Sequence, residues 1–437
     1  MKESIFNIYT EVENKKLLFN SLYCGLCEID DDFFSALKNL KENKELNSTE
    51  SEIVEKAVEA GFFVSDDEDE LAFLQMLKLK EKFDEKTLLL TIAPTLACNF
   101  ECVYCYEDNK RGVMTQQICD ELYSFIEKKA NKLEKLRITW YGGEPLLARQ
   151  IIYELSEKIC TLCKEKNIIY TAGIITNGSL IEEADIQLFR KYHIEMIQIT
   201  LDGPAQIHNS RRICKSIDNN FEIIVKKICL LLENNLNVHI RINVDKNNMQ
   251  YMGELIHILS QKLPNKNVHI GFARVSACTE ACAGISNNCF DVDEFSQEYF
   301  SLYELIKKYG FAVGTPLRYA NPRLNYCGAD TYNTLVIDSE GYLYKCWHDV
   351  GDENRSIGHV KNAGKAMLSA KTAKWVLNDA ISRNKCRECK VLPLCMGGCP
   401  SACFFNKGEP VCDEIKYNIT SILEANYYKE REKGAGI

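Results

Sequence analysis

The sequence lacks the features of several classes of protein. It has no apolar run long enough to cross a bilayer, and its first segment, MKESIFNIYTEVENKK, lacks the apolar core of a secretory signal. Positive charge is also scarce, because 53 Lys and Arg stand against 62 Asp and Glu, for a net charge of −9. Proteins that follow a phosphate backbone are usually basic. We therefore expect a cytoplasmic protein that binds neither a membrane nor nucleic acid.

Cysteine, in contrast, is plentiful. The 437 residues include 21 cysteines, many of them spaced as CxxC or CxxxC. In a short secreted chain such cysteines would indicate disulfides, but in a reducing compartment thiolates at these spacings more often hold metal. The length is that of two or three domains.

Residues 1–85 predict a small α+β module of winged-helix-like character. IFNIYT and LLFNSLY are typical of short strands, two or three helices follow, and FFVS indicates a further strand. The second helix is expected to begin with a capping box of Thr49 and Glu52. The module also contains an isolated CxxC, Cys24 and Cys27, for which metal binding and a role without metal both remain open.

Residues 86–275 alternate between strand and helix patterns. The strand candidates are LLLTIAP (88–94), RITWY (137–141), TAGIIT (171–176), MIQITL (196–201), VHIRINV (238–244) and VHIGFARV (268–275). Such alternation requires right-handed crossovers and a parallel sheet. Six units predict an incomplete (β/α)6 barrel of the TIM type, in which chemistry belongs at the carboxyl ends of the strands.

The remaining chain divides into a connection and a cysteine-rich end. Residues 276–325 are expected to connect, with one helix near 294–309. Residues 326–437 are rich in cysteine and glycine and show little periodicity, so we expect an irregular domain in which metal ligation replaces a hydrophobic core.

Two motifs follow the first two predicted barrel strands. After the first comes Cys98-x3-Cys102-x2-Cys105, a triad whose thiolates can bind three irons of a [4Fe–4S] cluster and leave the fourth iron open. The second strand ends in Tyr141-Gly142-Gly143-Glu144-Pro145. Its glycines let the backbone approach a ligand and its carboxylate can accept from an ammonium group, although a plain turn would also explain it.

Together these motifs resemble those of the radical S-adenosylmethionine (SAM) superfamily. The resemblance includes Tyr104 as the aromatic residue before the last cysteine, and it implies that Gly142, Gly143 and Glu144 bind the methionyl amino group of SAM. It further places Thr176 and Asn177 near the ribose, Asp202 at the start of the fourth-strand loop LDGPAQIHNSRR, and Arg211 or Arg212 at the SAM carboxylate. By strand alternation Arg241 points toward the same face. In this superfamily SAM is cleaved reductively, and a 5′-deoxyadenosyl radical takes a hydrogen atom from the substrate.

The later cysteines resemble a second motif, the SPASM domain, which binds two auxiliary [4Fe–4S] clusters. The pattern is Cys327-x13-Gly341-x4-Cys346, then Cys386-x2-Cys389-x5-Cys395-x3-Cys399, then Cys412. A zinc ribbon, the alternative, fits this spacing poorly. The resemblance implies a distal cluster on Cys386, Cys389, Cys395 and Cys412, and a proximal cluster on Cys327, Cys346 and Cys399. The fourth proximal position is either open or filled by Cys403, Cys278, Cys282 or Cys289.

Over nearly its whole length the sequence is similar to radical SAM/SPASM maturases of ribosomally made peptides. The resemblance implies a precursor peptide whose leader adds a strand to the N-terminal module at IFNIYT or LLFNSLY, and a low-potential electron donor of the flavodoxin or ferredoxin type. We expect the product to be a crosslink, most simply a thioether.

Three alternatives remain open. In the first, residues 1–85 are a docking or capping domain. In the second, the enzyme is an anaerobic sulfatase maturase that generates formylglycine. In the third, the chain is a non-catalytic electron carrier or iron–sulfur regulator. In sulfatase maturases an aspartate follows the second SPASM cysteine, but here Trp347 and His348 follow Cys346, which disfavours that reading.

Overall fold

The computed structural model describes residues 1–107, 112–313 and 321–432. These fall into two compact units. The first comprises the described parts of 1–82, 315–327 and 378–437, and the second those of 83–314 and 328–377. In the described parts of the chain, no helix is long and apolar enough to cross a membrane.

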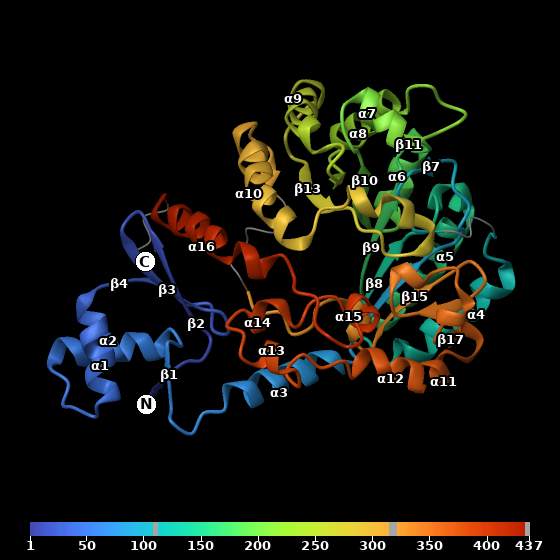
Figure 1. The fold of residues 1–437 in the computed structure, drawn as a ribbon. Coiled ribbons are helices and arrows are strands. Elements are labelled where there is room, and N and C mark those ends of the chain that lie inside the picture. Colours follow the sequence, from blue (N-terminus) through green and yellow to red (C-terminus); the bar gives the residue numbers. More distant parts are fainter. Residues whose placement is uncertain (108–111, 314–320, 433–437) are drawn as a thin grey trace. The chain divides into compact units, whose positions relative to one another are not determined.

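The second unit is built on a sheet in which all six predicted barrel strands are present and parallel to their neighbours (Figure 1). In spatial order they are β13 (His269–Arg274), β12 (Asn237–Val244), β10 (Ile194–Thr200), β9 (Ile169–Thr176), β8 (Lys135–Trp140) and β6 (Thr87–Ile92). The sheet confirms the predicted α/β partial barrel.

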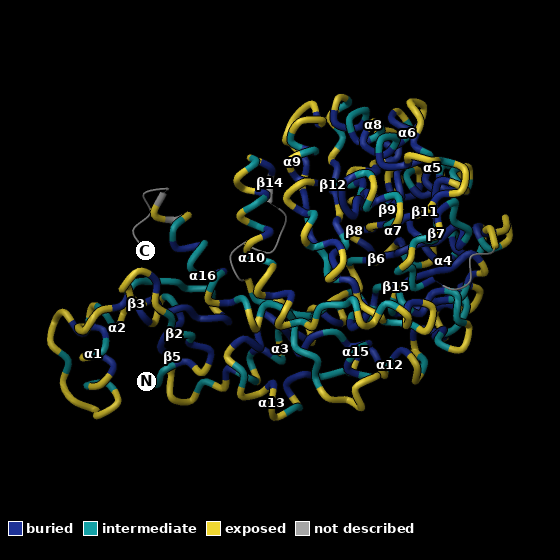
Figure 2. Tube along the Cα trace, turned by 45° about the horizontal axis from the view of Figure 1, so that its top comes forward, coloured by how far each residue is buried: buried dark blue, intermediate teal, exposed yellow. Residues whose placement is uncertain are grey.

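Helices follow the strands and bury their apolar faces against the sheet. They are α4 (Gln116–Ala130), α5 (Arg149–Lys166), α6 (Glu183–Lys191), α7 (Ala205–Arg211), α8 (Asn220–Glu233), α9 (Met252–Lys262) and α10 (Val292–Lys308). Thr115 caps α4 by accepting a hydrogen bond from the Ile118 amide, as a threonine before an apolar periodic segment predicts. Figure 2 shows buried strands and helices that are exposed on their outer faces.

Both edges of the barrel sheet are extended. β14 (Ala312–Val313) joins β13, and β15 (Thr334–Ile337) pairs in parallel with β6. Two antiparallel strands, β16 (Tyr342–Tyr344) and β17 (Gly358–His359), continue from β15, and α11 (Ala363–Met367) and α12 (Ala370–Val376) follow. The expectation that metal replaces a hydrophobic core throughout 326–437 is therefore wrong for this part, since β15 and β16 contribute fully buried side chains to the barrel.

The first unit begins with an antiparallel sheet of β2 (Asn7–Val12), β3 (Lys15–Asn20) and β4 (Leu26–Ile29), in that spatial order. Helices α1 (Asp31–Lys41) and α2 (Ser48–Glu59) pack on it, β1 (Lys2–Glu3) pairs with β5 (Phe63–Val64), and α3 (Glu70–Lys82) follows.

Three local expectations for this region are corrected. β4 was not anticipated, because LCEI carries only a weak strand pattern. The capping box of α2 is formed by Asn47 and Glu50 rather than Thr49 and Glu52, so the helix begins two residues earlier. LLFNSLY supplies the central strand β3, which leaves IFNIYT, the segment of β2, at an edge.

The C-terminal cysteine segment of the first unit consists of α13 (Asn384–Arg387), α14 (Leu392–Cys395), α15 (Pro400–Phe405) and α16 (Ile415–Glu432). It shares its core with the N-terminal residues. Phe6, Leu22 and Leu74 pack with Ala380, Ile381 and Leu392, and Phe19 packs with Leu394 and Leu423. On α3, the Lys78 ammonium lies 2.5 Å from an Asp379 carboxylate oxygen. Residues distant in sequence thus form one compact unit.

This shared core makes a testable prediction about stability. Leu74 of α3 is fully buried in it, and Leu74→Ala should lower the free energy of unfolding by about 2–5 kcal/mol, because the change leaves a cavity. Leu79→Ala on the same helix is the matched control, since Leu79 is 43% exposed and should change it by less than about 0.5 kcal/mol. Urea unfolding measures both; equal effects would contradict the shared core.

Candidate active site at the carboxyl ends of the barrel strands

The three cysteines of the first motif lie in one loop after β6. The loop contains β7 (Glu101–Cys102), which pairs antiparallel with β11 (Arg212–Ile213), so that Arg212 is opposite Cys102. The amide of Cys105 donates to the Cys102 carbonyl over 3.1 Å, and the amide of Phe100 donates to the Cys98 sulfur over 3.4 Å. All three cysteines are partly exposed. Three accessible thiols on one loop are a donor set that fits a [4Fe–4S] cluster with one open iron.

The glycines after β8 hold this loop in place through the backbone. The Gly143 amide donates to the Thr95 carbonyl over 3.2 Å, and the Glu144 amide donates to the Ala97 carbonyl over 2.9 Å. A Cβ atom at Gly143 would lie 2.4 Å from the Ala97 oxygen, and one at Gly142, where φ is +118°, would lie 2.2 Å from the Thr95 oxygen. Glycine is therefore required at both positions for contact with the cysteine loop itself.

Glu144 joins the ends of β8 and β9. Its fully buried carboxylate accepts from the Thr176 hydroxyl over 2.7 Å, from the Asn177 amide over 2.7 Å and from the Leu146 amide over 3.0 Å. Burial raises the pKa of Glu144, and these hydrogen bonds oppose the increase. Three residues singled out from the sequence, Thr176, Asn177 and Glu144, therefore lie in contact with one another.

Side-chain hydrogen bonds that no sequence motif predicts link the cysteine loop to the segment after β9. The Asn177 side chain donates to the Asn99 side-chain oxygen over 2.8 Å, and Asn99 donates to the Ser179 hydroxyl over 3.0 Å. Asn99 lies between Cys98 and Cys102, but an isolated asparagine carries no spacing signal of its own.

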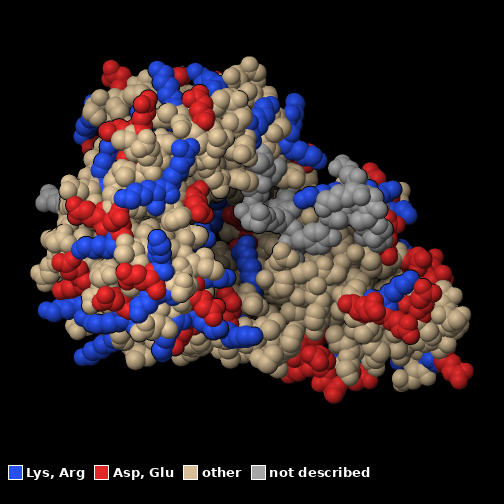
Figure 3. Space-filling view, turned by 180° about the vertical axis from the view of Figure 1, so that it is seen from behind, with Lys and Arg blue, Asp and Glu red and all other residues tan. Residues whose placement is uncertain are grey.

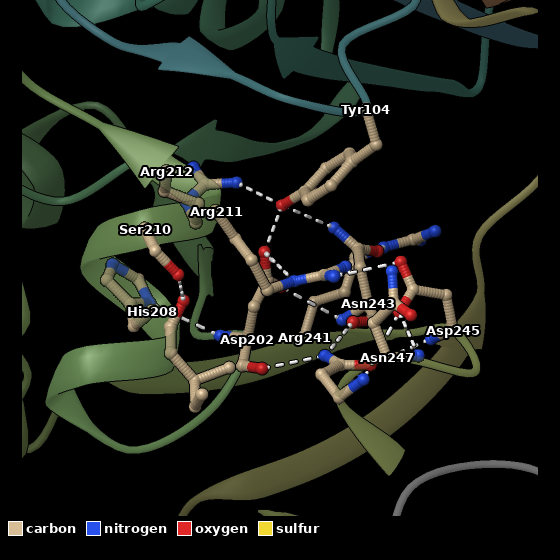
Figure 4. Close-up of polar contacts among 12 residues, drawn as sticks. Tyr104, Asp202, His208, Ser210, Arg211, Arg212, Arg241, Asn243, Asp245 and Asn247 are labelled. Atoms are coloured by element: carbon tan, nitrogen blue, oxygen red, sulfur yellow. Dashed lines mark hydrogen bonds and ion pairs between the residues drawn. The ribbon is translucent and has the colours of Figure 1, made fainter. Parts of the chain in front are cut away.

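A second network surrounds the Tyr104 hydroxyl (Figure 4). The hydroxyl donates to the Asp202 carboxylate and accepts from Arg212 over 2.8 Å and from the Asn243 side chain over 3.2 Å. Asp202 is fully buried, which raises its pKa, while Arg212 and Arg211 act in the opposite direction. Tyr104 thereby ties the cysteine loop to the ends of β10 and β12.

The two neighbouring arginines have different partners. Arg211 donates to the Asp245 carboxylate over 2.8 Å, so its charge is paired. Arg212 forms no ion pair with any described residue. Its buried Nε atom has no hydrogen-bond partner among them, and the same is true of the buried Nε and Nη2 atoms of Arg211. Arg241 is exposed, and its Nε donates to the Asn243 side-chain oxygen over 2.8 Å. Of the three, Arg212 is the one that is buried without an ion pair among the described residues, and its guanidinium donates to the Tyr104 hydroxyl.

An aromatic patch adjoins this network: Tyr106, Tyr141, Trp347 and His348. The two tyrosine hydroxyls are hydrogen-bonded to each other, and the ring centroids of Tyr106 and His348, like those of Tyr141 and Trp347, lie 4.9 Å apart. Burial, reinforced by Arg241, lowers the pKa of His348. Tyr106 and Tyr141 directly adjoin the two sequence motifs, which is the signal that could have identified them.

The cysteines after the last barrel strand lie close to the first motif. Thr279 donates from its hydroxyl to the Tyr106 carbonyl over 3.0 Å, one residue beyond Cys105. Cys282 is buried and accepts from the Thr279 amide over 3.4 Å. Cys278 and Cys289 are partly exposed on the same segment, which contains a 3-10 helix at Glu280–Asn288.

The four cysteines assigned to a distal cluster line one cavity of about 370 Å³ in the first unit. Its lining comprises Lys385, Cys386, Cys389, Leu392, Cys395, Gly397, Pro410, Cys412 and Lys416. A Cβ at Gly398, where φ is +75°, would lie 1.8 Å from the Val411 carbonyl oxygen, so glycine allows the two cysteine-bearing segments to meet. Four cysteines that line one cavity are a donor set that fits a fully protein-ligated [4Fe–4S] cluster. Within the described ranges, no three His, Cys, Asp or Glu side chains are arranged to hold a single metal ion.

The other cysteines are placed as follows. Cys327 and Cys399 belong to the first unit and Cys346 to the second. Cys403 is buried and donates to the Gly408 carbonyl over 3.1 Å. Cys24 packs with the apolar cluster around Phe19, whereas Cys27 packs with the core of the N-terminal module, so the CxxC pair divides between two cores.

The model of the radical SAM superfamily matches residues 92–259. The radical SAM cyclopropyl synthase TigE of Paramaledivibacter caminithermalis is 23% identical, over 96% of this chain and 94% of TigE. The cysteine-type anaerobic sulfatase-maturating enzyme of Clostridium perfringens strain 13 is 24% identical, over 79% of this chain and 94% of that enzyme.

Two solved structures share the fold. Native anSMEcpe with bound AdoMet and the Cp18Cys peptide has a TM-score of 0.61 at 20% identity, covering 80% of this chain and 98% of that one. Streptococcus suis SuiB bound to the precursor peptide SuiA has a TM-score of 0.55 at 15% identity, covering 92% of this chain and 96% of that one.

The glycine turn makes a prediction about metal loading. Gly143→Ala should abolish most iron binding at Cys98, Cys102 and Cys105, because the added Cβ displaces the backbone that precedes them. To isolate this site, the change is made in a background with Cys386→Ala and Cys346→Ala, and iron per chain is measured after anaerobic reconstitution. Gly253→Ala is the control, since its Cβ meets no atom within 4 Å. Full iron loading of the Gly143 variant would contradict the role given to the turn.

The Tyr104 network makes a second prediction. Tyr104→Phe removes one buried hydroxyl and leaves Asp202, Arg212 and Asn243 each one hydrogen-bond partner short, so the free energy of unfolding should fall by about 1–3 kcal/mol. Tyr123→Phe is the control, because the Tyr123 hydroxyl has no hydrogen-bond partner in the described chain. Denaturant titration of both proteins without metal measures the two free energies of unfolding. An unchanged free energy in the Tyr104 variant would show that the network does not stabilise the fold.

Proposed function

We propose that this chain, a radical SAM enzyme of the SPASM-type peptide-modifying group, installs a crosslink in a ribosomally made precursor peptide, most simply a thioether from a peptide cysteine to carbon. The observation that carries the proposal is the cysteine loop at the carboxyl end of β6, braced by the glycine turn after β8. When bound there, the cluster and SAM together supply a 5′-deoxyadenosyl radical.

The chain's own residues bind and orient the cofactors. Cys98, Cys102 and Cys105 would hold the first cluster, and the turn Gly142–Glu144 would face the methionyl amino group. We assign the SAM carboxylate to Arg212 rather than Arg211, because Arg211 is paired with Asp245. Support for a ribose site near Thr176 and Asn177 is their convergence with Glu144 at the end of β9.

Electrons released by crosslinking require an acceptor, and the proposed auxiliary clusters fill this role. The cavity lined by Cys386, Cys389, Cys395 and Cys412 supports a distal cluster. For a proximal cluster on Cys327, Cys346 and Cys399, Cys403 is disfavoured as fourth ligand because its thiol is engaged by the Gly408 carbonyl.

The precursor leader is proposed to add a strand to the N-terminal sheet. Of the two segments considered from the sequence, IFNIYT forms the edge strand β2 and LLFNSLY forms the central strand β3. We therefore propose β2 as the strand to which the leader adds, because an edge strand offers unpaired backbone groups to a peptide. Support comes from two solved structures of similar fold, SuiB bound to the precursor peptide SuiA and anSMEcpe with the bound Cp18Cys peptide.

Formylglycine generation is the second candidate, and the sulfatase-maturating relatives favour it. The residues after Cys346 argue against formylglycine generation. Trp347 is an aromatic side chain packed on Tyr141, and the nearby Asp349 is buried and paired with Arg355 over 3.2 Å. A carboxylate so engaged is poorly placed to take a substrate proton.

Coexpression with a short cysteine-containing peptide encoded beside this gene tests the proposal. A thioether removes the mass of two hydrogens and protects the peptide cysteine from alkylation. Formylglycine instead yields an aldehyde that reacts with hydrazide. A hydrazide-reactive product, or an unmodified peptide in the presence of active SAM cleavage, would overturn the crosslink proposal.

Cysteine substitutions separate the proposed roles. Replacing Cys98, Cys102 and Cys105 by alanine should abolish formation of 5′-deoxyadenosine from SAM and dithionite. Cys386→Ala or Cys412→Ala should keep this reaction but lose the peptide product. Cys229→Ala, a partly buried thiol on α8, is the control and should retain both. Full peptide modification by the Cys386 or Cys412 variants would contradict a role for the distal cluster.

A further inference from the structure

We propose that the surface around the distal cysteine cavity docks an acidic one-electron carrier, of the flavodoxin or ferredoxin class, which reduces the enzyme there. The inference rests on the proposed function, because it requires a cluster in that cavity. It adds the face of the molecule at which electrons enter. In the step itself, the carrier loses one electron and the oxidised cluster gains it.

The first observation is how near the cysteines lie to solvent. Cys389 and Cys412 are partly exposed, and the cavity that they line also contains residues of α13, α14 and the first turn of α16. A redox group held there would be separated from a docked protein only by the side chains around the cavity. Transient electron-transfer complexes need only a small interface.

The second observation is local positive charge. In the segments 383–390 and 407–416, five exposed side chains are basic: Lys385, Arg387, Lys390, Lys407 and Lys416. Two exposed side chains there are acidic, Glu388 and Glu409, and Glu409 is already paired with Lys385 over 2.9 Å. The whole chain has a net charge of −9. On the barrel unit, by contrast, basic and acidic side chains are interspersed over the face seen in Figure 3.

This charge reaches the cysteines themselves. The Lys416 ammonium lies 3.5 Å from the Cys412 sulfur. An acidic protein attracted to Lys416 is therefore brought to the edge of the cavity rather than to a remote surface. Attraction of this kind raises association rates by about 10- to 1000-fold at low ionic strength and fades with added salt.

The third observation is exposed aromatic surface beside the basic residues. Phe405, at the end of α15, is 64% exposed, and Tyr417, directly after Lys416, is 49% exposed. Aromatic side chains enriched among basic ones are typical of protein interfaces, which combine an apolar centre with a charged rim. The two features together favour a protein partner over a small anion.

Charge reversal tests the proposal. In the reconstituted full-length enzyme, Arg387→Glu with Lys390→Glu, two exposed residues outside the cavity lining, should slow reduction by photoreduced flavodoxin at least tenfold at low salt, and the difference should disappear at high salt. Lys307→Glu with Lys308→Glu on α10 is the matched control, with the same charge change at two exposed lysines, and should alter the rate less than about twofold. Stopped-flow absorbance under anaerobic conditions gives both rates.

Two further measurements keep the outcomes distinct. Iron per chain and the final yield of 5′-deoxyadenosine with excess dithionite should match wild type in both variants; if wild type itself gives none, the proposed function fails. If the Arg387 and Lys390 variant loses iron, Lys407→Glu, which lies farther in sequence from the assigned cluster cysteines, should still slow reduction severalfold. An equal effect of both double variants, no effect of any, or a loss of precursor-peptide affinity without a change in carrier rate would overturn the docking surface.

Discussion

The arrangement of the site depends on a backbone contact between two loops. The turn at Gly142 and Gly143 lies so close to the carbonyls of Thr95 and Ala97 that no side chain fits between them. Two amide hydrogen bonds close this contact. Because Ala97 directly precedes Cys98, the end of β8 sets the path of the loop that carries the first three cysteines.

Side chains extend this contact across the sheet. Glu144 holds the end of β9 through Thr176 and Asn177, and Tyr104 holds the ends of β10 and β12 through Asp202 and Asn243. Each buried carboxylate is satisfied by several donors, as a buried charge requires. Arg212 is a buried cation of this group without an ion pair in the described structure, whereas Arg211 is paired with Asp245.

Much of this organisation could be predicted from the sequence, for physical reasons that particular elements make clear. Each barrel strand has an apolar pattern typical of a buried strand, so the strands could be predicted one by one. Because the carboxyl ends of parallel strands lie at the same edge of a sheet, the motifs after β6 and β8 could be predicted to lie together. Asn99 acts only through tertiary contacts, which leave no spacing signal. Tyr106 and Tyr141, in contrast, directly adjoin the two motifs and could have been identified by that position. β15 and β16 were missed because metal ligation was expected to replace packing there. The common core of α3 and the C-terminal cysteine segment joins residues about 300 positions apart, which no local pattern reveals.

The central claim is that Cys98, Cys102 and Cys105 hold a [4Fe–4S] cluster whose remaining iron binds SAM. Electron paramagnetic resonance of a variant carrying Cys346→Ala and Cys386→Ala, reduced anaerobically and measured with and without SAM labelled at the methionyl nitrogen, tests it most directly. The account predicts a cluster signal that changes shape on addition of SAM and shows coupling to the labelled nitrogen. A signal that SAM leaves unchanged, or a preparation that binds zinc in place of iron, would contradict it.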